Sequence, residues 1–348
     1  MAVNRQYLTG SPAVVQWIPG ATPPGTAYYF SPRDDINVRH APVWVPVETS
    51  MHGEVDKVQK DYVIKVPLRL WGAWENLPIL FPSWVIDTSA TPHTQTTPFV
   101  KPIIGQRLYG TTDHELIIMG RTGEQITYHN AQLTKLSNLF LGLNAPIFSA
   151  DVEFTCLHQD PGKPVQSPND YYTIAATTYN AATVAFAKTN FVQQSYTATW
   201  GGKTGFTAAF QAKLGWNVEW DLTLEPEIID GLGTVDMIMQ GLIGRARCIP
   251  MQSGAGTGPT LAEIETASKF QGSGGGIGHL LSELAADGTS NLAIVGTGVW
   301  IQLRNAAMTE YGTVWGMKPL RKGEVAWETT VGFATGVSTA RAIVSTAV

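Results

Sequence analysis

Four kinds of residue in this 348-residue chain could carry chemistry: paired carboxylates, a cysteine near a histidine, scattered histidines and a glycine-rich run. Neighbouring carboxylates can act as general acid and base, and a thiol beside an imidazole can act as a nucleophile. A glycine-rich loop can hold phosphate groups with its backbone N–H groups. The residues concerned are Asp34/Asp35, Glu225/Glu227, Glu263/Glu265, Cys156 with His158, His114 with Glu115, and residues 272–278.

These groups lack the spacing that their chemistry requires. Residues 272–278 (GSGGGIG) follow a predicted helix and lack the Gly-Lys-Ser/Thr ending and the G-x-G-x-x-G spacing of phosphate loops, so we interpret them as a flexible turn. The carboxylate pairs have no pocket signature around them and are interpreted as solvated surface charges. Cys156 and His158 are too close along the chain to indicate a nucleophile and its base.

The histidines do not indicate a metal site either. All seven are scattered, and His114-Glu115 continues as Leu-Ile-Ile instead of completing H-E-x-x-H. Neither G-x-S-x-G nor Ser-x-x-Lys occurs in the chain. The sequence therefore predicts a protein that is not an enzyme and that has no catalytic, cofactor-binding or metal-binding residues.

The composition suggests a surface that is largely covered by other molecules. Charged residues make up 15% of the chain, whereas about 25% is typical of globular domains. The net charge of −5 argues against a protein that clamps nucleic acid, because phosphate binding requires clustered Lys and Arg.

The cysteines and the N-terminus bear on the compartment. Cys156 and Cys248 could form one disulfide at most, but each stands at the end of an apolar strand, so we expect two buried, free thiols. The N-terminus lacks a charged start followed by an apolar core, and no run of about 18 apolar residues occurs. These patterns predict a protein made in the cytosol with no membrane anchor.

Alternation of apolar and polar residues predicts a mainly β protein. The clearest strand is Tyr62–Leu70, in which every second side chain is apolar. Further strands are predicted at Thr204–Phe210, Trp216–Leu224 and Val235–Cys248. One helix is predicted from Thr260, because this N-cap residue precedes an apolar stripe at helical spacing.

A compact β unit lies between the first strands and the middle of the chain. Ile117–Met119, a turn at 121–124 and Gln125–Ala131 together predict a hairpin. A polar-edged segment, Leu133–Leu143, leads to a strand at Ile147–Leu157 in which apolar and polar residues alternate. We expect this strand to have one solvated face.

A diverged second version of this unit lies at Leu292–Phe333, and one constant shift without gaps aligns the two. The aligned pairs include Ile126 on Ile301, Asn130 on Asn305, Ala131 on Ala306, Thr134 on Thr309, Glu153 on Glu328 and Thr155 on Thr330. Agreement in one register favours duplication of a supersecondary unit. Two unrelated strand–turn–strand units with the same repetitive β pattern are the alternative.

The length also favours two domains. We predict an N-terminal arm at 1–39, a first domain at 40–157, a linker at 158–194 and a second domain at 195–348. The arm is rich in proline, which disfavours a central strand, so we expect it to lie across its own or a neighbouring subunit. Residues 84–113 are polar and rich in Pro and Thr, and predict an extended loop that contacts a neighbouring subunit or ring.

The repeated units resemble the tail tube (major tail) proteins of long-tailed bacteriophages. In that family a strand with a central His/Asn-Ala segment is followed, after a loop, by a closing strand of Val-x-Phe-Thr type. Similarity extends to Tyr196–Leu242 between the two units. The matching segments are GEQITYHNAQLTKLSNLFLG (123–142) with SADVEFTCL (149–157), and GVWIQLRNAAMTEYGTVWG (298–316) with GEVAWETTV (323–331).

The resemblance implies two tandem, related β-sandwich or rolled-sheet domains of tail-tube type, each with little helix. It implies a virion protein that assembles in the host cytoplasm into rings of three pseudo-sixfold chains, or of six chains, which stack into the tail tube. The implied partners are further copies of the chain, the tail tip, tape measure and tail terminator proteins, and genomic DNA that passes through without specific binding. A mildly acidic wall fits this passage, because a phosphate-neutralising wall would retard DNA.

Two other classes of protein stay open. One is a carbohydrate-binding β-sandwich module of a virion or cell-surface protein, which would use some of the eleven tryptophans as stacking platforms. The other is a two-domain hydrolase, which the sequence supplies with no recognisable catalytic residues.

Overall fold

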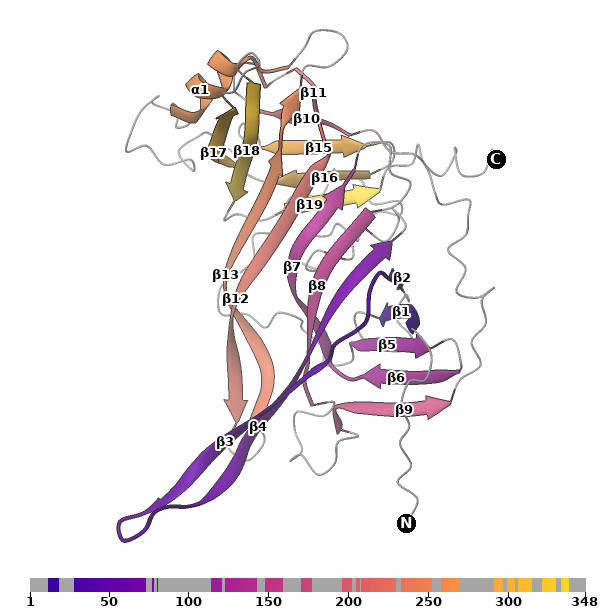
Figure 1. Cartoon of the computed structure of the whole chain (residues 1–348), viewed down its shortest axis with the longest axis vertical. Coiled ribbons are helices and arrows are strands. Elements are labelled where there is room, and N and C mark those ends of the chain that lie inside the picture. The colour runs from indigo at the N-terminus through magenta and orange to yellow at the C-terminus, as the bar shows by residue number, and fades with distance from the viewer. Residues whose placement is uncertain are drawn as a thin grey trace.

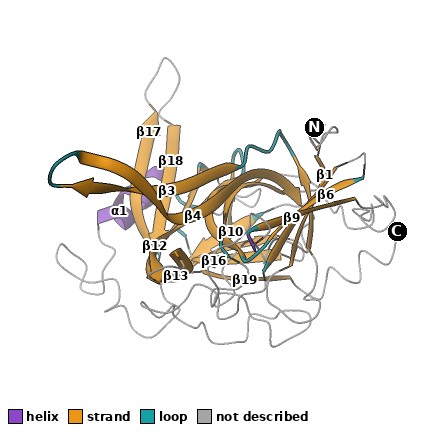
Figure 2. Cartoon of the chain, turned by 90° about the horizontal axis from the view of Figure 1, so that it is seen from below, coloured by secondary structure: helices purple, strands orange, loops and turns teal. Residues whose placement is uncertain are grey.

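The computed structural model forms a mainly β structure with one short helix, α1 (Leu261–Lys269), in the described part of the chain (Figures 1 and 2). The strands make one large antiparallel sheet and a smaller second sheet. A mainly β fold with little helix is therefore confirmed. The described residues are 12–18, 28–72, 77, 80, 114–120, 123–142, 148–158, 170–176, 196–201, 205–206, 208–229, 233–251, 258–269, 291–296, 299–303, 306–314, 321–329 and 333–337.

The large sheet has 13 strands. From one edge to the other they are β17 (Ala307–Val314), β18 (Arg321–Thr329), β13 (Gly233–Cys248), β12 (Trp216–Ile229), β7 (Ala131–Leu141), β8 (Phe148–Cys156), β4 (Gly53–Gly72), β2 (Tyr28–Pro32), β1 (Pro12–Ile18), β5 (Glu115–Gly120), β6 (Glu124–Tyr128) and β9 (Tyr172–Ala176). The remaining strand, β3 (Arg39–Thr49), pairs with the first part of β4. Together β3 and β4 form a long hairpin that projects from the body of the molecule (Figure 1).

The smaller sheet has 6 strands. In spatial order they are β14 (Pro250–Met251), β11 (Phe210–Ala212), β10 (Thr197–Trp200), β15 (Leu292–Gly296), β16 (Val299–Leu303) and β19 (Phe333–Val337). Strand β14 follows β13 after a single residue, so the two sheets share one continuous stretch of chain. The second sheet is therefore a branch from the large one.

Alternation along the chain places three of the predicted strands correctly. Tyr62–Leu70 lies within β4, where Ile64, Val66, Leu68 and Leu70 are buried. Trp216–Leu224 lies within β12 and Val235–Cys248 within β13. The polar-edged segment after the first hairpin is also a strand, β7, because its leucines alternate with solvated residues.

Two sequence expectations are corrected by the strand pairing. Most of the described part of the predicted N-terminal arm is sheet, because β1 lies between β2 and β5. Pro12 begins β1 and Pro32 ends β2, positions at which proline costs no central ladder bond. The strand predicted at Thr204–Phe210 is also wrong: residues 205–206 form a turn, and β11 begins only at Phe210.

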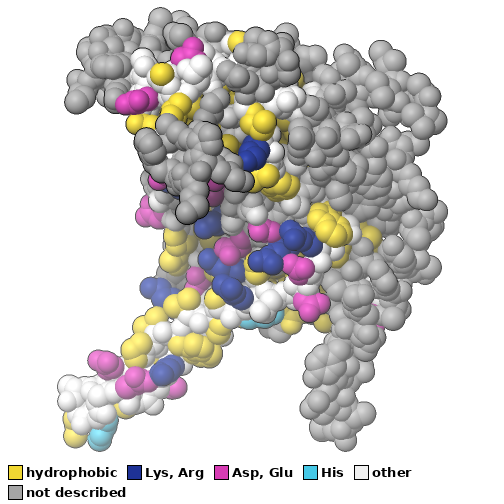
Figure 3. Space-filling model, turned by 45° about the horizontal axis from the view of Figure 1, so that its top comes forward, with side chains coloured by type: hydrophobic (Ala, Val, Ile, Leu, Met, Phe, Trp, Pro, Cys, Tyr) yellow, Lys and Arg dark blue, Asp and Glu magenta, His cyan; other side chains and the backbone are white. Residues whose placement is uncertain are grey.

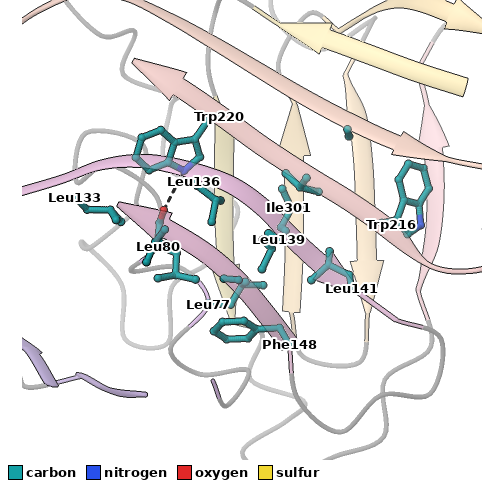
Figure 4. Close-up of a cluster of buried hydrophobic side chains, with 14 of the residues drawn as sticks. Leu77, Leu80, Leu133, Leu136, Leu139, Leu141, Phe148, Trp216, Trp220 and Ile301 are labelled. Atoms are coloured by element: carbon teal, nitrogen blue, oxygen red, sulfur yellow. Dashed lines mark hydrogen bonds between the residues drawn. The ribbon is translucent and has the colours of Figure 1, made fainter. Parts of the chain in front are cut away.

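The core lies between the two sheets and along the inner face of the large one. Leucines of β7 pack with Leu77 and Leu80 beneath Trp220, whose indole Nε1 donates a hydrogen bond of 3.0 Å to the carbonyl oxygen of Leu80 (Figure 4). Burial of each such leucine contributes about 1.5–3 kcal/mol relative to exposure. Cys156 and Cys248 lie in this core as free thiols, as predicted.

Helix α1 begins as its N-terminal residues predicted. The backbone N–H of Glu263 donates to the Thr260 hydroxyl over 3.2 Å, and the Glu263 carboxylate accepts from the N–H of Thr260 over 2.6 Å. This capping box satisfies two donors that the first turn leaves open. Ile264 and Ala267 face the core, so α1 is a packing element.

Strand pairing in the second part of the chain repeats the pairing in the first. The pairs β1–β2, β1–β5, β5–β6, β6–β9, β3–β4, β4–β8 and β7–β8 correspond in order to β10–β11, β10–β15, β15–β16, β16–β19, β12–β13, β13–β18 and β17–β18. Gln125–Thr134 lies on β6 and β7, and Trp300–Thr309 on the corresponding β16 and β17. Register shifts also correspond: Leu133/Lys135 in β7 matches Met308/Glu310 in β17.

Single hydrogen bonds repeat as well. Trp17 Nε1 donates to the carbonyl oxygen of Ala131 over 3.2 Å, and Trp200 Nε1 donates to that of Ala306 over 3.0 Å. Each indole also meets a ring of the closing strand edge-on, Phe154 of β8 in one case and Trp327 of β18 in the other. These contacts make Trp327 of β18 the counterpart of Phe154 of β8. The constant shift that places Glu153 on Glu328 differs from this correspondence by two residues.

Two sequence expectations fall outside the described residues. These are the extended loop at 84–113 and the glycine-rich run at 272–278.

Candidate self-assembly interface

The carboxylates singled out by sequence have structural partners. Asp34 binds the Arg69 guanidinium over 3.0 Å, Glu225 accepts a hydrogen bond of 2.6 Å from Gln240, and Glu263 completes the helix cap. These contacts do not assign any of the three carboxylates to an acid–base pair.

Cys156 is buried, and the nearby His158 has neighbours of its own. Complete burial raises the pKa of the Cys156 thiol well above its usual value, so the thiolate is not accessible. The His158 ring lies 3.5 Å from the Asp170 carboxylate and packs edge-on against Tyr171. Within the described ranges, no group of three or more His, Cys, Asp or Glu side chains is placed to hold a metal ion. Nor does any helix among those residues have the length and apolar character needed to cross a membrane.

Most tryptophans in the described part of the chain are buried. Trp17, Trp200, Trp216, Trp220 and Trp327 are among the largest fully buried side chains. Two others, Trp44 and Trp71, are 52% and 41% exposed. Buried indoles cannot stack on a sugar, so most of the described tryptophans serve the core.

One strand junction joins the two repeated parts of the chain. Strand β7 of the first part pairs with β12 of the second, with Trp216 opposite Leu141 and Asp221 opposite Lys135. The inner side of this junction is apolar and completely buried (Figure 4). On its outer side, Lys135 Nζ lies 3.9 Å from the Asp221 carboxylate.

The tip of the β12–β13 hairpin extends this junction beyond the end of β7. Thr234 donates its backbone N–H over 2.8 Å to the Asp61 carboxylate of β4, and its hydroxyl donates to the other oxygen of the same group. Gln132 of β7 donates to the Asp236 carboxylate over 3.2 Å. Thr234 and Asp236 are only 1% and 4% exposed, so the tip is locked onto the first part of the chain.

Gly233 begins this tip and should tolerate no side chain. Its φ is +77°, and a Cβ would lie 2.8 Å from an oxygen of Asp61. We expect Gly233→Ala to lower the free energy of unfolding by about 1–3 kcal/mol, because the backbone of Gly233 is strained and the new side chain would meet Asp61. Urea denaturation measures the loss. Gly53→Ala is the matched control: its φ is +67° but nothing lies within 4 Å, so backbone strain alone remains. Equal losses in the two variants would contradict the contact at Asp61.

The β3–β4 hairpin is the counterpart of β12–β13, but the residues at its tip are exposed. Both hairpins start their second strand with Gly-x-Val-Asp, at Gly53–Asp56 and Gly233–Asp236. Both have register shifts at the same two places, next to Val43 and Val47 in β3 and next to Thr223 and Glu227 in β12. Every residue of β3 is exposed.

Large apolar side chains cover the free hairpin. They are Val43, Trp44, Val45, Val47, Met51, Val55 and Val58, with exposed fractions from 39% to 84%. Figure 3 shows yellow side chains along this projection. A solvated hairpin with this apolar content indicates a surface that another molecule covers.

Strand β17 is the second open element. It corresponds to β7, yet it ends the order of strands in the large sheet, and its outer edge has no partner among the described strands. Glu310 and Tyr311 on this edge are exposed. Among the described strands, the chain thus has one closed junction, β7–β12, and both halves of a second, β17 and β3, whose outer edges are open.

The outer face of the large sheet carries acidic and basic side chains, which form a network of ion pairs across β4, β8, β7, β12, β13 and β18 (Figure 3). Arg245 binds Glu328 over 2.8 Å and Glu219 over 3.6 Å. The hydrogen bond to Glu328 raises the pKa of Arg245. The network comprises Lys65, Arg69, Lys135, Arg245 and Arg247 with Asp34, Asp151, Glu153, Glu219, Asp221 and Glu328.

Comparison of the sequence with models of known protein families finds no match, and comparison with curated proteins finds none either.

Sequence reasoning missed the equivalence of the two hairpins. The signal was present in the sequence, because a second constant shift places Phe30 on Phe210, Pro46 on Pro226 and Gly53–Asp56 on Gly233–Asp236. This shift differs from the one that aligns Ile126 with Ile301, so a single ungapped alignment could not show both.

Proposed function

We propose that the chain is a structural protein whose copies join edge to edge into closed rings, and that these rings stack into the tail tube of a long-tailed bacteriophage. Three chains would form a ring, each supplying two related β domains. The observation that carries this proposal is the closed junction β7–β12 together with its open counterparts, β17 and β3. Pairing of β17 with β3 of the next chain would repeat the closed junction between chains.

This contact is heterologous, because the two edges that meet are different. Heterologous contacts either close into a ring or continue as a filament. The contact would also cover two exposed edges that otherwise invite uncontrolled association. Ring closure accounts for both the open edges and the low content of charged residues.

The charged sheet face would line the channel. Its acidic and basic side chains are paired with each other across neighbouring strands, as in Lys65 with Glu153 at 3.5 Å. Charges compensated in this way offer few free cations for phosphate, so genomic DNA could pass without being held. The ends of the tube would meet the tail tip, tape measure and tail terminator proteins. The protein would assemble in the host cytoplasm and remain in the virion tail.

Electron microscopy of the purified protein, with the symmetry of ring or tube cross-sections, tests this function. We expect hollow rings or tubes with three chains per ring and pseudo-sixfold density. A protein that stays monomeric at every concentration and in every assembly condition would contradict the proposal. True sixfold symmetry at the level of whole chains would exclude the three-chain ring.

Engineered cysteines can test the pairing of β17 with β3. The internal junction sets Asp221 opposite Lys135, and the corresponding residues are Ala41 of β3 and Glu310 of β17. Directly opposed side chains have Cβ atoms about 4.5–5.5 Å apart. We therefore expect Ala41→Cys/Glu310→Cys to form covalent dimers and trimers under oxidation or with a short thiol-reactive bridge.

The readout is a non-reducing denaturing gel, on which closed three-chain rings give no species larger than a trimer. The natural thiols are buried and should not react. Ala41→Cys/Thr313→Cys is the control, since three residues along a strand displace the partner by about 10 Å. Equal cross-linking of the two pairs would show that β3 and β17 do not meet in this register.

A further inference from the structure

Three polar side-chain contacts described above cross the closed junction, and none of them can form at its open counterpart with the residues present. They are Lys135 with Asp221, Gln132 with Asp236, and Thr234 with Asp61. The corresponding pairs are Glu310 with Ala41, Ala307 with Asp56, and Glu54 with Gly241. Each of these pairs lacks a donor or an acceptor that the internal junction has.

The third of these exchanges is the most specific. Asp61 in β4 and Gly241 in β13 occupy the same place beside a register shift, opposite Val43 and Thr223 respectively. Asp61 accepts two hydrogen bonds from Thr234, whereas Gly241 has no side chain to accept any. In the free hairpin, Glu54 stands where Thr234 stands in the docked one, and it pairs with Lys57 over 3.3 Å at the surface.

We infer that these exchanges make the two-domain chain the fixed unit of assembly and leave the junction between chains the weaker one. Asp61 in the first half and Gly241 in the second decide which hairpin each half binds. This inference rests on the proposed ring. Thr234 fits Asp61 as a donor. Glu54 would set a second carboxylate against Asp61, so the β3–β4 hairpin is excluded from the first half of another chain and directed to the half that carries Gly241.

The partner that fits the β3–β4 hairpin is therefore a second copy of this chain. The argument is continuity with the junction already present: β17 and β3 correspond to β7 and β12, which pair within the chain, and only the polar side-chain contacts differ. A like-charge contact with the wrong partner, together with a hydrogen bond to the right one, is a common way to fix the order of an assembly.

Introducing the counterpart of the Thr234–Asp61 pair at the open junction tests the inference. Glu54→Thr/Gly241→Asp places a threonine on the free hairpin and a carboxylate at its expected docking point. The new side chain at 241 fits, since a Cβ there would lie 3.6 Å from the Thr223 hydroxyl. We expect the double variant to associate about tenfold more tightly than the natural chain, as for one added hydrogen bond to a charged group.

The single variants complete a double-mutant cycle. Gly241→Asp alone should weaken association, because Glu54 would then face a carboxylate. Glu54→Thr alone should change association little, because an exposed ion pair contributes little and Gly241 offers no acceptor. Sedimentation or native mass spectrometry over a concentration series gives the dissociation constants, and unfolding midpoints confirm that each monomer is folded.

Glu54→Thr/Gly241→Asn is a second version that carries no added charge, should position 241 not accept Asp. Coupling of the two sites in either double variant supports the inference. Additive effects in both, with normal association of the natural chain, would overturn the inference and leave the ring intact. Failure of the natural chain and every variant to associate would overturn the ring, and the inference with it.

Discussion

Replacing residues 45–58 with an Asn-Gly turn should give a chain that folds normally but forms no rings. These residues are the outer part of the β3–β4 hairpin, and all of them are exposed. The last remaining ladder pair would be Trp44 with Gln59, which a two-residue turn can join. Little buried area is lost, so the free energy of unfolding should change by less than about 1 kcal/mol. Assembly should disappear, because the exposed apolar outer part of the docking hairpin is gone and only its inner part, which carries Ala41, remains.

The same truncation in the second hairpin is the matched control. Residues 225–238 occupy the corresponding positions, between Leu224 and Met239. They include the buried Thr234, Val235 and Asp236. Removing them should cost several kcal/mol, about 3–5, because buried side chains are lost, Asp61 loses both hydrogen bonds from Thr234, and Gln132 loses its bond to Asp236.

Urea denaturation and electron microscopy of both variants distinguish the roles of the two hairpins. The first variant should have a native midpoint and no rings, and the second a lowered midpoint. Normal rings from the first variant would show that the free hairpin is not an assembly element.

Trp200→Ala should cause the largest loss of stability among single substitutions. The indole is 0% exposed, contacts Phe206 and Trp327, and donates its Nε1–H to Ala306. Truncation should lower the free energy of unfolding by about 3–5 kcal/mol through the cavity it leaves. Trp200→Phe keeps an aromatic ring but leaves the Ala306 carbonyl without this donor, at a cost of about 1–3 kcal/mol.

Trp44→Ala is the control for these variants. Trp44 is 52% exposed on the free hairpin, so its removal should change monomer stability by less than about 0.5 kcal/mol. Equilibrium unfolding in urea gives all three values. A loss at Trp44 as large as that at Trp200 would mean that the hairpin is buried in the monomer.

Much of the local structure could be predicted from the sequence. Alternation located Tyr62–Leu70 in β4, and the Thr260 and Glu263 pair located the start of α1. The burial of Cys156 and Cys248 followed from their apolar neighbours. These features depend on interactions within a few residues or on one face of one strand, so a single segment contains the information.

Residues 12–32 show where this reasoning reaches its limit. Their prolines suggested an arm, yet β1 is an inner strand of the large sheet. A proline forbids only the ladder bond at its own position, and Pro12 and Pro32 stand at strand ends. Whether such a segment enters a sheet depends on the edge that distant residues offer it, here those of β5 and β4.

The sequence by itself determined where the strongly alternating strands run, such as Tyr62–Leu70 in β4 and Trp216–Leu224 in β12, and which of their faces are apolar. Only the tertiary structure decided which strands lie side by side, and hence that β12 covers β7 while β17 and β3 have open edges among the described strands. The physical reason is that side-chain alternation fixes the two faces of a strand, whereas its two edges present the same N–H and C=O groups whatever the sequence. An edge therefore becomes a junction or an open surface according to its neighbours in space.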